Sequence, residues 1–172
     1  MKAETDVGEY RFEDDGSIPN NPTLPLLAYP QALDKPELDP SRCKGLLSEN
    51  GWGGSWVDGV FPYHHYHSTS HEVLCVIGGS ASITVGSPQG ETIEVSAGDA
   101  VVIPAGVGHC NEGSDSEFSV VGAYPRDQEN YDLRTGEEGE RPEVLENISN
   151  AALPESDPLF GDEGPLVRRW TE

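Results

Sequence analysis

Residues 59–79 read GVFPYHHYHSTSHEVLCVIGG and contain four of the five histidines of this 172-residue chain. The fifth, His109, lies in a second glycine-rich segment, residues 98–111, which reads GDAVVIPAGVGHCN. Histidines that serve only packing or surface polarity would be scattered along a chain. Their concentration in two separate segments indicates a metal site that both segments help to build.

The spacing of these residues predicts which of them meet. His65 and His67 are two apart in a segment rich in β-favouring residues, so on a strand both imidazoles project from one face. Glu72 begins the apolar run 73–77, which we interpret as a buried strand that brings its carboxylate beside the imidazoles. His109 arrives from a later strand and completes a set of three nitrogens and one oxygen. Such a set suits iron, manganese, copper, nickel or zinc and leaves positions for water or substrate.

Both segments resemble the conserved motifs of the cupin family. The first resembles G(x)5HxH(x)4E(x)6G, filled by Gly59, His65, His67, Glu72 and Gly79. The second resembles G(x)5PxG(x)2H, filled by Gly98, Pro104, Gly106 and His109. The two motifs stand in the family's order, and the chain is also similar to the uncharacterised YjlB-like group of single-domain cupins.

This resemblance implies a fold and a set of roles. The expected fold is all-β, a double-stranded β-helix (jelly roll), and the expected partner chain is a second copy in a homodimer. The implied metal ligands are His65, His67, Glu72 and His109, and Glu72 is also the candidate catalytic base. The family's second motif ends in an asparagine where this chain has Gly113.

Several neighbouring residues have open roles. Asn111 stands two residues after His109 and is expected on the same strand face, beside the ligands. His71 competes with Glu72 for the fourth position, and otherwise lies beside the site or at its mouth. His64 is expected on the surface or in packing. Some cupins have lost their metal, and histidines inside a β-barrel can also be hydrogen-bonded core residues.

The rest of the chain predicts one domain with three parts. Residues 51–125 show short alternating apolar runs separated by turn signals, as in a single barrel without internal repeats. Residues 1–50 read as an arm and a short helix over 36–49, capped by Asp39 or Ser41. The proline-rich residues 20–30 are predicted to form neither a helix nor a central strand, and to wrap the barrel. Residues 126–172 form an acidic extension, helical near 143–148, whose apolar residues dock on the barrel.

The charge of the chain restricts its partners. Ten Lys and Arg stand against 31 Asp and Glu, a formal net charge of −21. A surface this acidic repels phosphates, so neither nucleic acid nor an anionic membrane is an expected partner. Such an acidic composition also resembles that of proteins from high-salt cytoplasms, so we hypothesise that the protein is adapted to high salt.

The cysteines and the N-terminus favour a cytoplasmic location. No apolar segment follows the first residues, and three cysteines without a CxxC pair fit a reducing compartment. Cys75 is expected in the core. Cys110 follows His109 directly, so it is expected to face the other side of the strand.

The distribution of cations suggests the class of substrate. No Lys or Arg occurs between Glu49 and Tyr124, so only the metal itself, or Arg42, Arg126 and other residues of the flanking segments, could pair with a phosphate or dicarboxylate. A small neutral or aromatic molecule fits better, and the candidates to contact it are Phe61, Tyr63, Tyr66 and Trp52. The leading hypothesis is a metal-dependent oxidoreductase of the dioxygenase type. A Lewis-acid isomerase or lyase and a non-catalytic binding protein are the alternatives.

Overall fold

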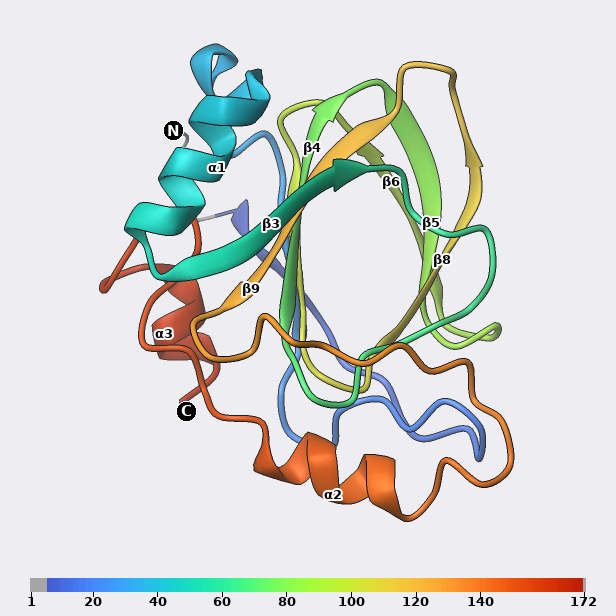
Figure 1. Ribbon diagram of the computed structural model, residues 1–172. Coiled ribbons are helices and arrows are strands. Elements are labelled where there is room, and N and C mark those ends of the chain that lie inside the picture. Colours follow the sequence, from blue (N-terminus) through green and yellow to red (C-terminus); the bar gives the residue numbers. More distant parts are fainter. Residues whose placement is uncertain (1–5, 172) are drawn as a thin grey trace.

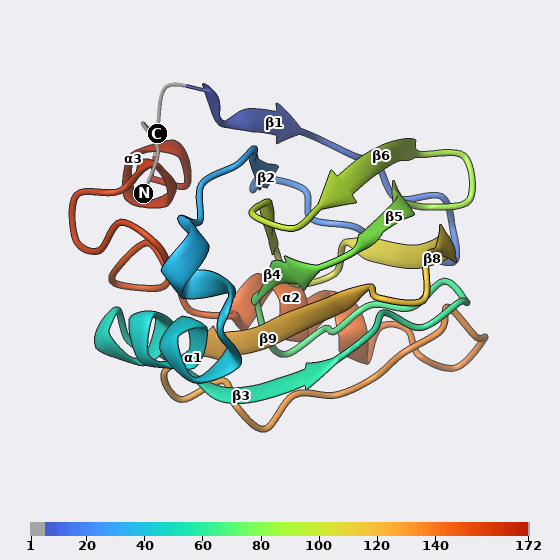
Figure 2. The same ribbon diagram turned by 90° about the horizontal axis from the view of Figure 1, so that it is seen from above.

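Two antiparallel β-sheets face each other in the computed structural model of the chain, which describes residues 6–171 (Figures 1 and 2). The larger sheet has the strand order β1-β2-β7-β4-β9-β3, and the smaller has β6-β5-β8. The strands are β1 (Gly8–Tyr10), β2 (Leu26–Tyr29), β3 (Trp52–Asp58), β4 (Glu72–Gly78), β5 (Ser80–Gly86), β6 (Glu91–Ser96), β7 (Ala100–Ile103), β8 (Gly108–Ser114) and β9 (Ser119–Pro125). The helices are a 3-10 helix (Lys35–Leu38), α1 (Pro40–Glu49), α2 (Glu143–Asn150) and α3 (Pro165–Arg169). The predicted all-β jelly roll is confirmed.

β4, in the interior of the larger sheet, is buried on both faces, which explains its continuous apolar run. Val73 and Cys75 face a cluster that includes residues of α1 and α3. Leu74 and Val76 face the barrel interior, where they pack against residues of β5, β6 and β7. A strand with two buried faces cannot alternate between apolar and polar residues.

The N-terminal region corrects one prediction. Residues 20–30 were expected to form no central strand, but β2 lies inside this segment, paired with β1 on one side and β7 on the other. The strand is possible because Pro25 and Pro30 flank β2, where no ladder hydrogen bond is lost. The predicted division between the arm and the barrel near residue 51 therefore cuts through one sheet, because β1 and β2 lie before it and the other strands of the same sheet lie after it.

The predicted helix over 36–49 is divided in two. The 3-10 helix ends at Leu38, and α1 begins after Asp39, whose carboxylate accepts a hydrogen bond from Arg42 N at 3.1 Å. This confirms Asp39 as the cap. Pro40 occupies the first position of α1, where its missing N–H costs nothing.

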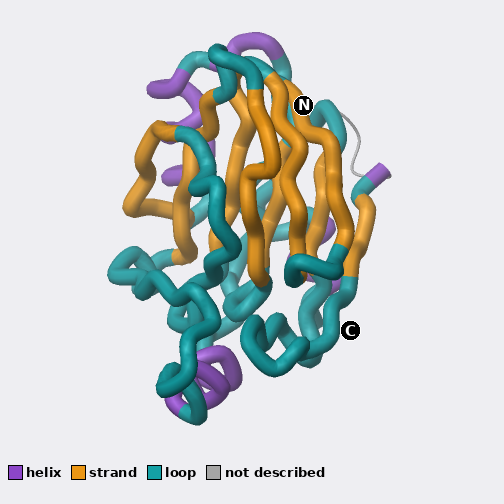
Figure 3. The backbone as a smooth tube through the Cα atoms, turned by 90° about the vertical axis from the view of Figure 1, so that its right-hand side faces the viewer, coloured by secondary structure: helices purple, strands orange, loops and turns teal. Residues whose placement is uncertain are grey.

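The C-terminal extension crosses one end of the barrel and then returns along its side, with α2 beneath the strands (Figures 1 and 3). Its buried anchors include Leu159, Leu166 and Trp170, whereas Leu145 and Leu153 are exposed. Asp157 is fully buried and accepts hydrogen bonds from the Tyr29 hydroxyl and from backbone N–H groups of the extension. No helix within residues 6–171 has the length and apolar character needed to cross a bilayer.

Candidate metal centre

Three connected parts of the fold bring the candidate ligands together. His65 and His67 lie between β3 and β4, Glu72 is the first residue of β4, and His109 lies on β8. His65 and His109 form an isolated antiparallel bridge through two backbone hydrogen bonds of 3.1 and 2.9 Å. The segment around His65 is not a regular strand, but its backbone is extended at this bridge, so His65 and His67 project from the same face.

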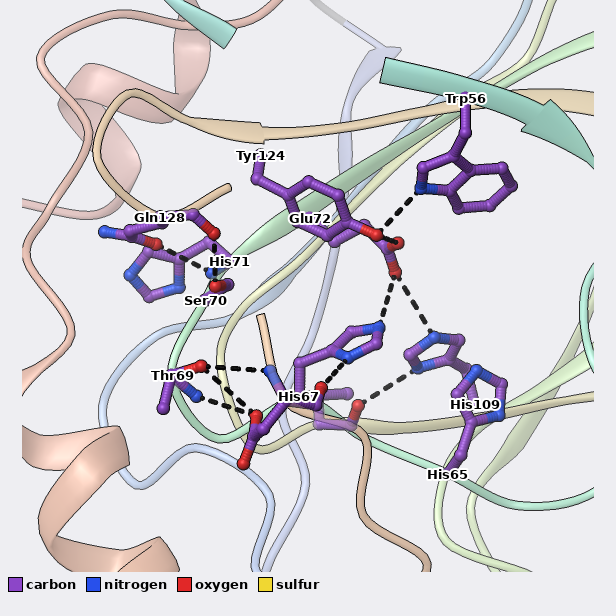
Figure 4. Close-up of polar contacts among 12 residues, drawn as sticks. Trp56, His65, His67, Thr69, Ser70, His71, Glu72, His109, Tyr124 and Gln128 are labelled. Carbon is purple, nitrogen blue, oxygen red and sulfur yellow. Dashed lines mark hydrogen bonds and ion pairs between the residues drawn. The ribbon is translucent and has the colours of Figure 1, made fainter. Parts of the chain in front are cut away.

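The four side chains converge at the barrel's open end (Figure 4). Ligand atoms of His65, His67 and His109 all lie within 4.8 Å of one another. Glu72 Oε1 lies 3.4 Å from Nε2 of His67 and 3.4 Å from Nε2 of His109. All four residues are buried, so the structure pays a desolvation cost to keep these polar groups together.

Hydrogen bonds from the Nδ1 atoms to backbone carbonyl oxygens fix the orientation of the three imidazoles. Nδ1 of His65 contacts Tyr63 O at 2.9 Å, and Nδ1 of His109 contacts Val107 O at 3.2 Å. Nδ1 of His67 contacts the carbonyl oxygen of Asp132. A carbonyl only accepts, so each Nδ1 carries a proton, and in the neutral imidazole Nε2 is the nitrogen with the lone pair. This tautomer, set by a backbone carbonyl, is the usual one for histidines that bind metal through Nε2.

The two oxygens of Glu72 have different surroundings. Oε2 accepts a hydrogen bond of 2.9 Å from the Tyr124 hydroxyl, which itself accepts one of 2.8 Å from Trp56 Nε1 (Figure 4). Oε1 is buried and accepts no hydrogen bond among residues 6–171. A buried carboxylate oxygen without a donor is costly unless a cation binds it.

Burial and neighbouring charges shift the pKa values of these groups. Burial, together with the nearby His109, lowers the pKa of His65 to about 3, so this imidazole is neutral. Burial opposes charge on His67, but the Glu72 carboxylate outweighs it and raises the pKa of His67. Burial would raise the pKa of Glu72, yet the adjacent His67 and His109 hold it well below its usual range. Glu72 is therefore an anion.

These residues fit a divalent transition-metal ion. Two donor atoms bound at roughly 2.1 Å with tetrahedral angles lie about 3.4 Å apart, which matches the separation of Glu72 Oε1 from each of the two imidazoles. Neutral Nε2 donors and one carboxylate also form a donor set that many such ions accept. The arrangement can hold a metal and leave part of its surroundings open.

The ligand candidates form the floor of a cavity of about 430 Å³. Its walls are mainly apolar and aromatic and include Trp56, Phe61, Tyr131 and Leu133. No Lys or Arg within residues 6–171 lines it.

The extension contributes Tyr131 and Leu133 to the cavity wall, whereas the next residue, Arg134, does not line the cavity. Arg134 forms ion pairs with Asp132 at 2.9 Å and Glu143 at 3.8 Å.

Comparison with known proteins identifies the family. Residues 56–121 match the cupin domain family. Over 172 residues the chain is 45% identical to the uncharacterised protein YjlB of Bacillus subtilis strain 168, and the alignment covers all of both proteins. The chain belongs to the cupin family.

Solved structures share the fold of this cupin at lower identity. Acireductone dioxygenase from Bacillus anthracis, with cadmium in its active centre, is 16% identical with a TM-score of 0.41. That match covers 73% of this cupin and 81% of the dioxygenase chain. Procruciferin, an 11S globulin from Brassica napus, is 20% identical with a TM-score of 0.40, over 57% of this cupin and 27% of the globulin chain. This cupin thus spans about a quarter of the globulin, and both likenesses concern the fold alone.

Of the four aromatic candidates, two lie at or beside the cavity and two are buried elsewhere. Phe61 lines the cavity and stacks on Tyr63 with ring centroids 5.0 Å apart. Tyr63 also lies edge-on to His65, outside the cavity lining. Trp52 and Tyr66 are buried elsewhere, where they donate hydrogen bonds to Ser156 O and to Glu140.

His71 and Asn111 lie away from the cavity lining. Asn111 accepts a hydrogen bond of 2.9 Å from Gly113 N, and its amide donates to Ser114 Oγ at 3.2 Å. His71 is buried against Trp170, and its Nδ1 accepts a hydrogen bond of 2.9 Å from Ala105 N. Burial lowers the pKa of His71 to about 4, so it is a neutral packing residue of the core.

Sequence reasoning missed the residues that support the ligands. Tyr124 and Tyr131 stack with centroids 4.2 Å apart, and both line the cavity. The carbonyl oxygen of Asp132 accepts a hydrogen bond from Nδ1 of His67. The carboxylate of Asp132 accepts hydrogen bonds from Ser68 N and Thr69 N, the two residues that follow His67. The contacts of Tyr124 with Glu72 and of Asp132 with His67 join residues more than 50 positions apart, so no local spacing pattern indicates them.

Proposed function

We propose that this cupin is a metal-dependent oxidoreductase of the dioxygenase type that acts on a small neutral or aromatic molecule. The observation that carries this proposal is the set of three imidazoles, each held through Nδ1 by a backbone carbonyl, around a carboxylate oxygen that accepts no hydrogen bond within residues 6–171, in a cavity that no Lys or Arg of those residues lines. His65, His67, Glu72 and His109 would hold the ion. A redox-active ion bound there would supply the electron-transfer chemistry.

The donor atoms disfavour ions that prefer sulfur ligands. The cavity lining offers imidazole and carboxylate ligands but no sulfur. Cys110 is adjacent to His109 in sequence, but its side chain is not part of that lining. Imidazole and carboxylate sets without thiolate bind iron, manganese, copper(II), nickel and zinc alike, and the proposed oxygen chemistry calls for a redox-active ion such as iron or manganese among them.

The cavity supports a small substrate without charge. Its volume of about 430 Å³ lies in the range of small-molecule sites. Trp56, Phe61 and Tyr131 offer aromatic faces against which a planar molecule can pack. A phosphate or dicarboxylate would meet the carboxylates of Asp58 and Glu72 in the lining and no Lys or Arg of residues 6–171, so only the metal could pair with it.

The protein's own groups position the reaction. Burial, followed by the nearby Glu72 charge, raises the pKa of Tyr124 above its usual range, so its hydroxyl stays protonated and holds Glu72 Oε2. This contact leaves Oε1 free. That oxygen can bind the ion or accept a proton from a substrate in the cavity, the two roles predicted for Glu72.

Metal content tests the site itself. Freshly purified protein should contain iron or manganese by plasma emission spectrometry, and the His65→Ala/His67→Ala variant should lose it. Glu117→Gln is the control because Glu117 is exposed and lies outside the cavity lining, and it should keep that metal. Failure to bind either ion after reconstitution would overturn the proposal.

Oxygen uptake tests the reaction. A panel of neutral aromatic and aliphatic compounds should include at least one that causes oxygen consumption with the metal-loaded protein and not with the double variant. Turnover of a substrate without oxygen consumption would instead indicate a Lewis-acid isomerase or lyase. Tight binding without turnover would indicate a non-catalytic cupin. The homodimer and the cytoplasmic location stay predictions, the first testable by light scattering.

A further inference from the structure

A second cluster of metal-binding side chains lies back to back with the first. Ligand atoms of His64, Cys110 and Glu112 all lie within 4.8 Å of one another. None of these residues lines the cavity. The geometry points to a second metal site, of the zinc class, on the outer side of the segment and strand that carry the inner ligands.

The bridge between His65 and His109 explains why the two clusters are related. In an antiparallel pair, neighbours along each chain face opposite sides. His65 and His109 are directly opposite each other and face inward. His64 and Cys110, one residue before and one after, are therefore the next pair across the bridge and face outward together.

A β-bulge adds the third ligand. On β5, Ile83 pairs with Asn111 and Ser82 pairs with Gly113, so Glu112 is an extra residue of β8 without a partner on β5. Bulges re-aim side chains and are frequent next to functional sites. Glu112 Oε2 lies 3.8 Å from His64 Nε2.

The polar atoms of this cluster have few other partners. Nδ1 of His64 is buried and has no hydrogen-bond partner within residues 6–171. The Cys110 sulfur makes one long contact of 3.8 Å, to Asn111 O, and its side chain is buried. The cluster thus combines an imidazole, a thiol and a carboxylate, and one imidazole nitrogen has no hydrogen-bond partner within residues 6–171. These are the ligand types of a metal site that lacks its ion.

The ligand types select the ion. One sulfur, one imidazole nitrogen and one carboxylate oxygen are the three kinds of ligand that zinc binds in proteins, and the exposed side of Glu112 leaves room for water as a fourth. The thiol proton passes to solvent as the sulfur binds. An ion here would tie the segment that carries His65 and His67 to the strand that carries His109.

Cobalt(II) provides the test, because it replaces zinc and reports thiolate ligands by a near-ultraviolet charge-transfer band. Metal-free, reduced full-length protein should develop this band on cobalt addition and lose it when zinc is added. Cys110 is the informative thiol: Cys43 and Cys75 are buried in the core, and neither belongs to any cluster of potential ligands in the described chain.

Variants assign the band to the site. Cys110→Ser should abolish it, and His64→Gln or Glu112→Gln should weaken cobalt binding by roughly tenfold or more. Glu117→Gln removes the same charge from an exposed position and should leave binding unchanged. Circular dichroism checks that each variant is folded.

The inner-site variant His65→Ala/His67→Ala should keep the band, which separates this inference from the proposed function. A wild-type protein that shows the band but binds neither iron nor manganese would overturn only the proposed function. A wild-type protein without the band, or a band that survives in Cys110→Ser, would overturn the second site and leave Cys110 as a packing residue.

Discussion

Replacing Tyr124 by Phe tests whether a hydrogen bond holds the Glu72 carboxylate in place. The change removes only the hydroxyl that donates to Glu72 Oε2 and accepts from Trp56 Nε1. The ring remains and keeps its stacking on Tyr131. Any loss of stability therefore reports the hydrogen bonds and not the packing.

The expected loss can be worked out from these two contacts. A hydrogen bond to a charged group contributes about 1.5–3 kcal/mol, and a part-buried donor left without a partner costs about 1 kcal/mol more. The free energy of unfolding should therefore fall by roughly 3 kcal/mol. For a chain of this length that corresponds to a decrease in Tm of roughly 6–12 °C.

Urea unfolding of metal-free protein at constant ionic strength is the appropriate assay, because a bound ion would hold Glu72 independently of Tyr124. Tyr63→Phe is the matched control: Tyr63 is 43% exposed, and its hydroxyl has no hydrogen bond within residues 6–171. The control should change stability by less than about 0.5 kcal/mol. A Tyr124→Phe variant as stable as this control would refute the reasoning.

Three further predictions concern stability. Burial opposes ionisation of Glu140, but hydrogen bonds from Tyr66 and backbone N–H groups outweigh it and lower its pKa. The ionised carboxylate therefore stabilises the fold, and wild type should lose more stability than Glu140→Gln as the pH falls below 4.5. Parallel pH profiles would contradict this. Asp157→Asn should destabilise the fold by about 2–4 kcal/mol because one amide oxygen cannot accept all the hydrogen bonds at this site, whereas exposed Asp162→Asn should have little effect. The net charge of −21 predicts unfolding free energies that rise from low to molar salt, and a flat profile would contradict halophilic adaptation.

The parts of the fold that follow local periodicity could be predicted from the sequence. The strands between residues 51 and 125 alternate or run apolar as their burial requires, and Asp39 caps α1 as its type and position suggest. The convergence of His65, His67 and Glu72 followed from strand geometry and motif spacing. Each of these features depends on residues that are close in sequence.

The remaining features depend on contacts that no local pattern encodes. β2 is central because β1 and β7 pair with it, although its flanking prolines suggested an edge. His71 has the same side chain as the candidate ligands, but Trp170 from the end of the chain packs against it in the core. Tyr124 reaches Glu72 only because β4 and β9 are neighbours in the sheet.

The crossing of the cavity mouth by the C-terminal extension has an evolutionary consequence. The region that matches the cupin domain ends at residue 121, yet Tyr131 and Leu133 lie in the cavity wall beyond it. Relatives with the same ligands and different tails would present different walls to a substrate. Substrate preference can thus diverge by exchange of a short terminal segment while the chemistry of the centre is inherited intact, and tail exchange between relatives offers a direct way to redesign it.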